Sequence, residues 1–440
     1  MPRSVRPLRR ALPLLAGAAL ALPAAARAQA LSPQERRIAA YVDAHTEDAV
    51  GLLQRLVDVN SGTMNPAGVR RVGGMVRAQL DSLGFATRWV EMPDSMHRAG
   101  HLFAERTGRR GKRVLLIGHL DTVFEEDSPF QAFARRGSTA AGPGTTDMKG
   151  GDVVILYALR ALQAAGALEG TRIVVAFTGD EENPGQPLEV ARRDLIEAGK
   201  RSDAALEFEA GSRDGATEYA VTARRSSTGW RLDVTGRSAH SSGIFSQGVG
   251  SGAIFEAARI LDAFQQELRG EPNLTFNAGV ILGGTQVTYD EEGTRGTAFG
   301  KDNVVPGTAV ATGDIRTLTD EQLQRTRERM RAIVARHLPQ TSATITFTEG
   351  YPSMPPTPGN QALLDQLNGV NRALGLGVMQ AFDPGRRGAA DVSFVAPYTS
   401  GLAGRGVQGS GSHTVNEQVD LASLPVAIKR TALLLYRLTR

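Results

Sequence analysis

The chain lacks cysteine, and it lacks any apolar run long enough to cross a membrane. None of its 440 residues is cysteine, which excludes disulfide bonds and thiolate metal sites. The uncharged apolar stretch Ala11–Ala26 is shorter than the roughly 20 residues that a spanning helix needs, and no later run is longer. Any metal ion must therefore be held by carboxylates and imidazoles, and we expect no membrane contact once the N-terminal segment is removed.

Three common catalytic motifs are absent as well. The chain has no Gly-x-Ser-x-Gly nucleophile elbow, no Gly-x4-Gly-Lys-Ser/Thr phosphate loop and no His-Glu-x-x-His helix. The chemistry of these three templates is therefore not predicted for this protein.

Residues 1–30 have the composition of a secretory signal peptide. Four arginines precede the apolar stretch, and Ala28-Gln29-Ala30 is typical of a cleavage site. The segment carries five arginines and no acidic residue, so its removal lowers the formal charge from +4 to about −1. We expect a secreted or periplasmic protein without a nucleic-acid partner. The pair Arg9-Arg10 leaves Sec and twin-arginine export both open.

Two domains are predicted for the mature chain, because about 410 residues exceed what one hydrophobic core usually organises. The sequence pattern changes near Ser226, and the Pro-rich segment Tyr351–Pro358 indicates a return to the first domain. We therefore predict one domain from residues 31–225 and 351–440, and a second, inserted domain from residues 226–350.

Hydrophobic periodicity predicts an α/β first domain and an α+β insert. In the first domain we expect helices at 32–60, 65–84 and 151–165 and buried strands at 113–118 and 172–178. A helix between two buried strands implies a right-handed parallel crossover. In the insert we expect strand, helix, strand, strand, helix, strand, with identifiable members at 230–235, 250–268, 277–282, 309–316 and 320–337. Segments 361–374, 391–396 and 424–438 complete the first domain.

Acidic and histidine side chains occur where predicted strands or glycine-rich loops end. They are His119 and Asp121 in Gly-His-Leu-Asp-Thr-Val, Asp147 in Gly-Pro-Gly-Thr-Thr-Asp-Met-Lys-Gly-Gly, the pair Glu181-Glu182 and His413 in Gly-Ser-Gly-Ser-His. Each alone has an ordinary interpretation as a turn, core or solvated residue. Their joint occurrence at positions where α/β proteins place their chemistry predicts a metal site.

The same residues favour a site for two ions. Two divalent ions close together need a carboxylate between them, and hydrolysis needs a further carboxylate that is not a ligand and can move a proton. In Glu181-Glu182, neighbouring side chains point different ways, so one can bind metal while the other faces the substrate.

These motifs resemble the dinuclear zinc exopeptidases and deacylases, a family that includes glutamate carboxypeptidase of the carboxypeptidase G type, acetylornithine deacetylase, succinyl-diaminopimelate desuccinylase and aminoacylase. The resemblance covers about residues 35 to 438. It implies a zinc-exopeptidase-like catalytic domain, in which helices sandwich a mixed, mostly parallel sheet, and an inserted ferredoxin-like dimerisation domain. A homodimer through the insert follows from the same resemblance.

The resemblance also assigns the ligands. It implies His119 and Glu209 on one zinc ion, Glu182 and His413 on the other, and Asp147 between the two. Two Zn²⁺ per subunit are thus expected, with Co²⁺ or Mn²⁺ as compatible substitutes.

The resemblance gives Asp121 the task of orienting the His119 ring and Glu181 that of general base and acid. Glu207 is the alternative to Glu209, because both lie on the same side of one strand; the family pattern of a ligand directly after an aromatic residue favours Glu209.

Three residues of the insert receive roles only through the resemblance. His240 in Ser-Ala-His would reach the partner's active site and stabilise the oxyanion, while Asn303 and Arg316 would bind a substrate carboxylate. From the residues alone, His240 is a turn residue and Arg316 is a surface residue or the ion-pair partner of Asp314.

The sequence therefore predicts a secreted zinc-dependent hydrolase that cleaves an amide bond beside a free carboxylate in a small peptide or N-acyl amino acid. The alternatives are a non-catalytic amino-acid- or peptide-binding relative, which would not need Glu181, and a biosynthetic-type deacetylase, which a signal peptide disfavours.

Overall fold

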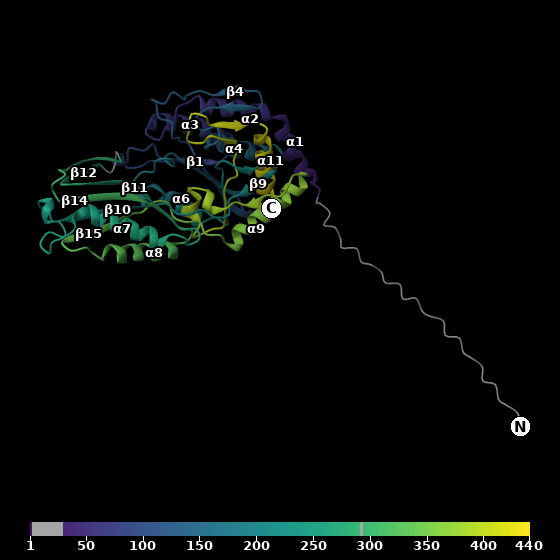
Figure 1. Ribbon diagram of the computed structural model, residues 1–440. Coiled ribbons are helices and arrows are strands. Elements are labelled where there is room, and N and C mark those ends of the chain that lie inside the picture. Colours follow the sequence, from purple (N-terminus) through teal and green to yellow (C-terminus); the bar gives the residue numbers. More distant parts are fainter. Residues whose placement is uncertain (2–29, 291–293) are drawn as a thin grey trace.

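The computed structural model describes Met1 and residues 30–290 and 294–440, and Figure 1 shows that they form a larger part and a smaller one. The smaller part, called the insert below, runs from β10 (Thr228–Gly236) to β15 (Thr341–Thr348). The predicted signal peptide lies, except for its two end residues, outside the described residues. The predicted domain limits at residues 225 and 350 stay predictions.

A six-stranded mixed sheet forms the centre of the larger part. Its strand order is β1-β2-β6-β3-β7-β17. The pairs β6·β3, β3·β7 and β7·β17 are parallel, and β1·β2 and β2·β6 are antiparallel. The bounds are β1 Ala86–Val90, β2 His101–Thr107, β3 Arg110–His119, β6 Thr171–Thr178, β7 Ala204–Glu207 and β17 Gly401–Leu402. The predicted parallel crossover joins β3 to β6 through α4 (Lys149–Ala164).

Both faces of this sheet are buried, which explains the continuous apolar runs in its strands. In β3, Val114 and Leu116 face one core, and Leu115 and Ile117 face the other. The first core also contains α1 Pro33–Ala44, α2 Thr46–Val57, α3 Pro66–Ser82, α4, α9 Pro358–Ala373 and α11 Ser423–Leu438. The second contains α5 Leu188–Ala191, α6 Arg193–Lys200 and α10 Val392–Val395. These layers confirm the predicted α/β class.

The single helix predicted over residues 32–60 is wrong, because the chain forms α1 and α2 with a break at His45. His45 has φ −120° and ψ 21°, and its ring stacks on Tyr41 at 4.0 Å. The break lets Ile38 of α1 and Leu53 of α2 enter the same core from two helix directions. A capping box formed by Ser32 and Glu35 determines where α1 begins.

The insert has the predicted ferredoxin-like order of strand, helix, strand, strand, helix, strand. Its antiparallel sheet has the order β11-β14-β10-β15, and α7 and α8 pack on one face of it, at the lower left in Figure 1. The bounds are β10 Thr228–Gly236, α7 Gly252–Leu268, β11 Thr275–Gly284, β14 Thr308–Arg316, α8 Asp320–Val334 and β15 Thr341–Thr348. An additional hairpin, β12 Gln286–Asp290 and β13 Arg295–Phe299, lies between β11 and β14 in the chain.

Two small sheets complete the larger part. One contains β4 Ala134–Arg136, β5 Thr139–Ala141, β18 Gly409–Ser410 and β19 Gln418–Asp420. The other contains β8 Ser212–Asp214, β9 Thr217–Ala220 and β16 Gln380–Ala381. Short 3₁₀ turns occur at Asp94–Met96, Ser241–Gly243 and Pro384–Arg386.

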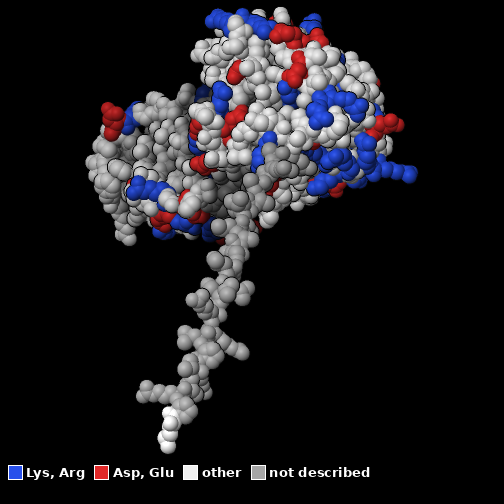
Figure 2. All heavy atoms as spheres, turned by 90° about the vertical axis from the view of Figure 1, so that its right-hand side faces the viewer, with Lys and Arg blue, Asp and Glu red and all other residues white. Residues whose placement is uncertain are grey.

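The described surface carries charges of both signs. Figure 2 shows Lys and Arg side chains sharing one face with Asp and Glu side chains, as expected from 50 basic and 46 acidic residues in the chain. Among the helices of the described residues, none combines the length and apolar character that a membrane crossing requires.

Candidate metal centre

Three parallel strands end at the same edge of the central sheet and carry three of the predicted ligands. His119 is the last residue of β3, Glu182 follows the end of β6, and Glu209 follows the end of β7. Because β3 pairs with both β6 and β7, the carboxyl ends of the three strands are adjacent.

The other two predicted ligands approach from outside the sheet. Asp147 stands two residues before α4, whose first turn contains Gly151; a Cβ atom there would lie only 1.9 Å from the Phe208 carbonyl oxygen. Only glycine permits this close approach of α4 to the end of β7. His413 lies in the loop between β18 and β19 at φ 64°, a left-handed conformation that is uncommon for residues other than glycine and often found at functional sites.

The five side chains form two triads that share Asp147. One contains His119, Asp147 and Glu209, and the other Asp147, Glu182 and His413; the possible ligand atoms of each triad lie within 4.8 Å of one another. Oδ1 of Asp147 lies 3.4 Å from Nε2 of His119, and Oδ2 lies 3.0 Å from Nε2 of His413. The two oxygens of Asp147 thus face different triads, the arrangement that a bridging carboxylate requires.

Polar atoms without partners show that the triads fit metal ions. Nε2 of His119 and Oε1 of Glu182 are buried, and neither has a hydrogen-bond partner among the described residues. A buried unpaired polar atom costs free energy unless something else binds it. The donor set of imidazole nitrogen and carboxylate oxygen is the one that zinc accepts in the absence of thiolates.

The second triad favours a positive charge at its centre. Asp147 and Glu182 raise the pKa of His413 to about 10. Burial raises the pKa of Glu182 to about 7, and repulsion from the carboxylate of Asp147 adds to the rise. A cation shared by these groups, whether a proton or a metal ion, relieves that repulsion.

Asp121 supports both the histidine and the acidic pair. One of its carboxylate oxygens lies 3.4 Å from Nδ1 of His119, and its backbone carbonyl oxygen lies 3.1 Å from the same nitrogen, so the role of its carboxylate in orienting the ring stays a prediction. The carboxylate also accepts hydrogen bonds from the backbone N–H groups of Glu181 and Glu182, each at 3.0 Å. Thr63 donates a further hydrogen bond at 2.6 Å. Burial opposes ionisation, but the bonds with His119 and Thr63 hold the pKa of Asp121 below its usual value.

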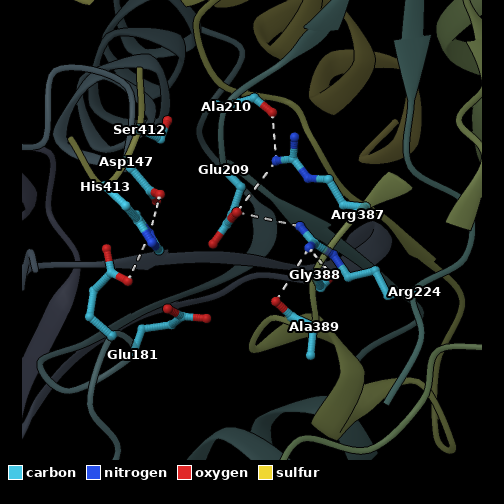
Figure 3. Close-up of a pocket in the computed structure, with 11 residues that line it drawn as sticks. Asp147, Glu181, Glu209, Ala210, Arg224, Arg387, Gly388, Ala389, Ser412 and His413 are labelled. Atoms are coloured by element: carbon cyan, nitrogen blue, oxygen red, sulfur yellow. Dashed lines mark hydrogen bonds and ion pairs between the residues drawn. The ribbon is translucent and has the colours of Figure 1, made fainter. Parts of the chain in front are cut away.

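Glu181 belongs to neither triad, and it lines a cavity of about 300 Å³ beside them. Figure 3 shows its side chain near His413 and Glu209 at this cavity. Burial and the carboxylate of Glu209 raise the pKa of Glu181 well above its usual value. A carboxylate that prefers to hold a proton next to metal-ligating groups is suited to proton transfer.

The structure places Glu209, and not Glu207, in a triad. The Glu207 carboxylate is buried, accepts a hydrogen bond from Arg224 at 2.7 Å and accepts another from the backbone N–H of Val392 at 2.9 Å. These partners occupy the carboxylate of Glu207, while Oε1 of Glu209 lies 3.9 Å from Nε2 of His119.

Arg224, Arg387 and Glu417 are site residues that the sequence reasoning missed. Arg224 and Arg387 line the cavity opposite His413 and lie 3.6 Å and 3.4 Å from Glu209 (Figure 3). The buried carboxylate of Glu417 accepts hydrogen bonds from the N–H groups of Gly144, Thr146 and Asp147, and so positions the loop that carries Asp147. Glu417 stands four positions after His413, which was the one available signal.

The three residues predicted in the insert lie away from this cavity. The residues that line it within the described chain all come from the larger part. His240 is exposed, and its Nδ1 lies 2.8 Å from the Ser242 hydroxyl; Asn303 is exposed nearby, with its carbonyl accepting the Ser241 N–H. Arg316 pairs with Asp314 at 2.9 Å. Within one chain, His240 lies in a turn and Arg316 pairs with Asp314, as their sequence positions alone suggested.

Comparison with known proteins matches residues 115–437 to the model of peptidase family M20/M25/M40. Carboxypeptidase G2 from Pseudomonas sp. (strain RS-16) is 27% identical over 380 residues, which cover 85% of each chain. Succinyl-diaminopimelate desuccinylase from Methylibium petroleiphilum is 26% identical over 393 residues, covering 86% of this chain and 94% of that protein.

Solved structures share the fold. The aminopeptidase PepT from Bacillus cereus is 18% identical, with a TM-score of 0.71 over 90% of this chain and 99% of its own. A dinuclear metal-binding peptidase of the M20 family from Bacillus subtilis is 17% identical, with a TM-score of 0.62 and the same coverage.

Proposed function

Because this chain belongs to peptidase family M20/M25/M40, we propose that it is a zinc-dependent enzyme that hydrolyses an amide bond beside a free carboxylate. The substrate would be a small peptide or an N-acyl amino acid. The observation that carries this proposal is the pair of triads around Asp147, with Glu181 at the same cavity but outside both triads. The similarity to a carboxypeptidase and a desuccinylase supports the same substrate class.

In the proposed site, His119, Asp147 and Glu209 would hold one ion, and Asp147, Glu182 and His413 would hold the other. When bound, two divalent ions would lower the pKa of a water molecule and polarise the scissile carbonyl. Asp121 fixes the ring of His119 and the backbone of Glu181-Glu182, so the ligands and the proton-transfer group keep one relative geometry.

Glu181 takes the proton from the attacking water and returns it to the leaving nitrogen. Among the described carboxylates that line the cavity, that of Glu181 belongs to neither triad. Its raised pKa suits it to hold that proton between the two steps. A protein that only bound amino acids or peptides would have no need of a carboxylate in this position.

Residues 1–30 support a secreted or periplasmic location as part of the proposal, since their composition is that of an export signal.

Exposed apolar side chains support a homodimer through the insert. Phe245 and Phe255 have rings 5.8 Å apart and are 69% and 52% exposed. Ile281, on the edge strand β11, is 52% exposed. Exposed apolar side chains of this kind are typical of an interface, and a partner bound there could bring its own His240 to the cavity.

Subunit exchange tests whether His240 acts across such an interface. Glu181→Gln and His240→Ala should each be nearly inactive alone, and a mixture that has exchanged subunits should recover up to about a quarter of wild-type activity. In the hybrid dimer one site receives both wild-type groups and the other receives neither. Each mutant mixed with itself is the control. If exchange is demonstrated and activity stays at the level of the single mutants, action across the interface is refuted.

A comparison of acid and amide substrates tests the substrate class. A panel of N-acyl amino acids, dipeptides and folate-like glutamates first identifies a good substrate. Its C-terminal amide should then show a kcat/KM about 10- to 100-fold lower, because the amide loses charge-assisted bonds to Arg316, supported by Asn303.

The Arg316→Ala variant should lose most of that preference, because it lacks the planar guanidinium group that suits bidentate binding of a carboxylate. Arg269→Ala, an exposed arginine elsewhere in the insert, is the matched control. Equal kcat/KM for acid and amide in the wild type would rule out recognition of a free carboxylate.

A further inference from the structure

We propose that Tyr351 is a positioning residue that holds Glu181 in place through the backbone carbonyl of Glu181. The inference rests on the proposed role of Glu181 in proton transfer. Tyr351 lies in the segment that returns from the insert, between the end of β15 at Thr348 and the start of α9 at Pro358. Its hydroxyl donates a hydrogen bond of 2.9 Å to the Glu181 carbonyl oxygen.

The direction of this hydrogen bond is set by Arg192. Nη2 of Arg192 lies 2.9 Å from the Tyr351 hydroxyl oxygen and can only donate. The hydroxyl therefore accepts from Arg192 and keeps its own hydrogen for the carbonyl of Glu181. Because Arg192 is fully buried, water does not compete for this arrangement.

Arg192 is itself held rigidly by two carboxylates. Its Nε lies 2.7 Å from Asp391 and its Nη1 lies 2.6 Å from Asp180, and these three side chains are buried. Thr178, the last residue of β6, donates a further hydrogen bond of 2.7 Å to Asp391. The group that orients the Tyr351 hydroxyl is thus anchored to the strand that leads to Glu181.

Glu181 is consequently fixed from two sides. Asp121 accepts hydrogen bonds from the backbone N–H groups of Glu181 and Glu182, and Tyr351 donates a hydrogen bond to the carbonyl oxygen of Glu181. The peptide units on both sides of the Glu181 Cα are fixed in this way, which limits the directions that its carboxylate can take. The second contact comes from a segment that also connects to the insert, so it ties Glu181 to the chain leaving that part.

Packing alone does not explain the hydroxyl of Tyr351. The ring packs against Phe394 with centroids 4.9 Å apart, and the guanidinium of Arg192 lies 5.8 Å from its centre. A phenylalanine would keep both ring contacts, and the charge of Arg192 is already matched by Asp180 and Asp391. The hydroxyl adds two hydrogen bonds, one accepted from Arg192 and one donated to the carbonyl of Glu181. Without the hydroxyl, Nη2 of Arg192 keeps its hydrogen bond to the Asp180 carbonyl oxygen at 3.1 Å, so the contact with Glu181 is the one that has no substitute among the described contacts.

The Tyr351→Phe variant tests the proposal directly. We expect kcat to fall roughly 10-fold, while KM, bound zinc and the thermal unfolding temperature stay close to wild type. The half-exposed Tyr398 supplies the matched control, Tyr398→Phe, which should behave as wild type. An unchanged kcat in Tyr351→Phe, or a fall in kcat accompanied by loss of zinc or of thermal stability, would overturn the assignment.

A double-mutant cycle separates positioning from a general structural effect. If Tyr351 acts through Glu181, adding Tyr351→Phe to Glu181→Gln should change kcat by no more than about 2-fold, because the group it positions is already disabled. A full further 10-fold loss would show that Tyr351 acts independently of Glu181. Near-normal turnover in Glu181→Gln alone would instead refute the proposed function, so the two failures are distinguishable.

Discussion

Glu181→Gln should turn over substrate at least about 100-fold more slowly than the wild-type protein while binding substrate and zinc as before. The amide has nearly the shape of the carboxylate but cannot accept the proton of the attacking water. Glu181 contributes to neither triad, so the substitution leaves both sets of ligand atoms intact. The backbone contacts to Asp121 and Tyr351 do not involve the altered side chain and should persist.

The measurements are kcat, KM and zinc content on the same preparation. Glu189→Gln is the matched control, because Glu189 is an exposed glutamate eight positions along the same segment. Turnover within a few-fold of wild type in Glu181→Gln would remove Glu181 from the mechanism. A fall in activity matched by loss of zinc would make it a ligand instead.

The positions of the strand-end ligands could be predicted from the sequence because the signal is local. A buried parallel strand shows a continuous apolar run; His119 follows one such run directly, and Glu182 stands four residues after the end of another. Once β3 and β6 are recognised as parallel neighbours, their carboxyl ends must meet, and the side chains that follow them must be close. The ferredoxin-like insert was predictable for the same reason, since five of its six elements were identified from their periodicities, while β15 was expected only as the strand that completes the pattern.

Other features depend on contacts between distant segments, which no local pattern records. Arg387 reaches Glu209 from a loop 178 residues away in the chain, and Glu417 reaches the Asp147 loop across 270 residues. Arg387 is one of 50 basic residues, and no motif in the adjacent sequence identifies it as a residue of the site. The break at His45 was missed because the apolar pattern continues through it, and packing of two helices on one core decides the geometry.

The positions of three insert residues within one chain do not explain the roles predicted for them. His240, Asn303 and Arg316 received their roles from a family resemblance, and the cavity of this chain is lined by the larger part alone among the described residues. Their proposed function requires a second subunit or a movement of the insert, and subunit exchange addresses it.

Loss of one ligand from one triad should remove one ion of the proposed pair. His413 is the suitable residue, because its side chain is 55% exposed and its replacement disturbs the core little. His413→Ala leaves His119, Asp147 and Glu209 intact, so we expect bound zinc to fall from two ions to one per chain. Activity should fall by about 100-fold or more, since two-ion activation is lost. The exposed histidine variant His97→Ala is the control and should keep both ions.

The zinc content of the purified wild-type protein tests the central claim most directly. After removal of metal by a chelator and reconstitution with zinc, elemental analysis against protein concentration should give two ions per chain, because the triads around Asp147 provide ligands for two. A value of one ion per chain or fewer, from protein that is folded and saturated with zinc, would contradict the dinuclear centre.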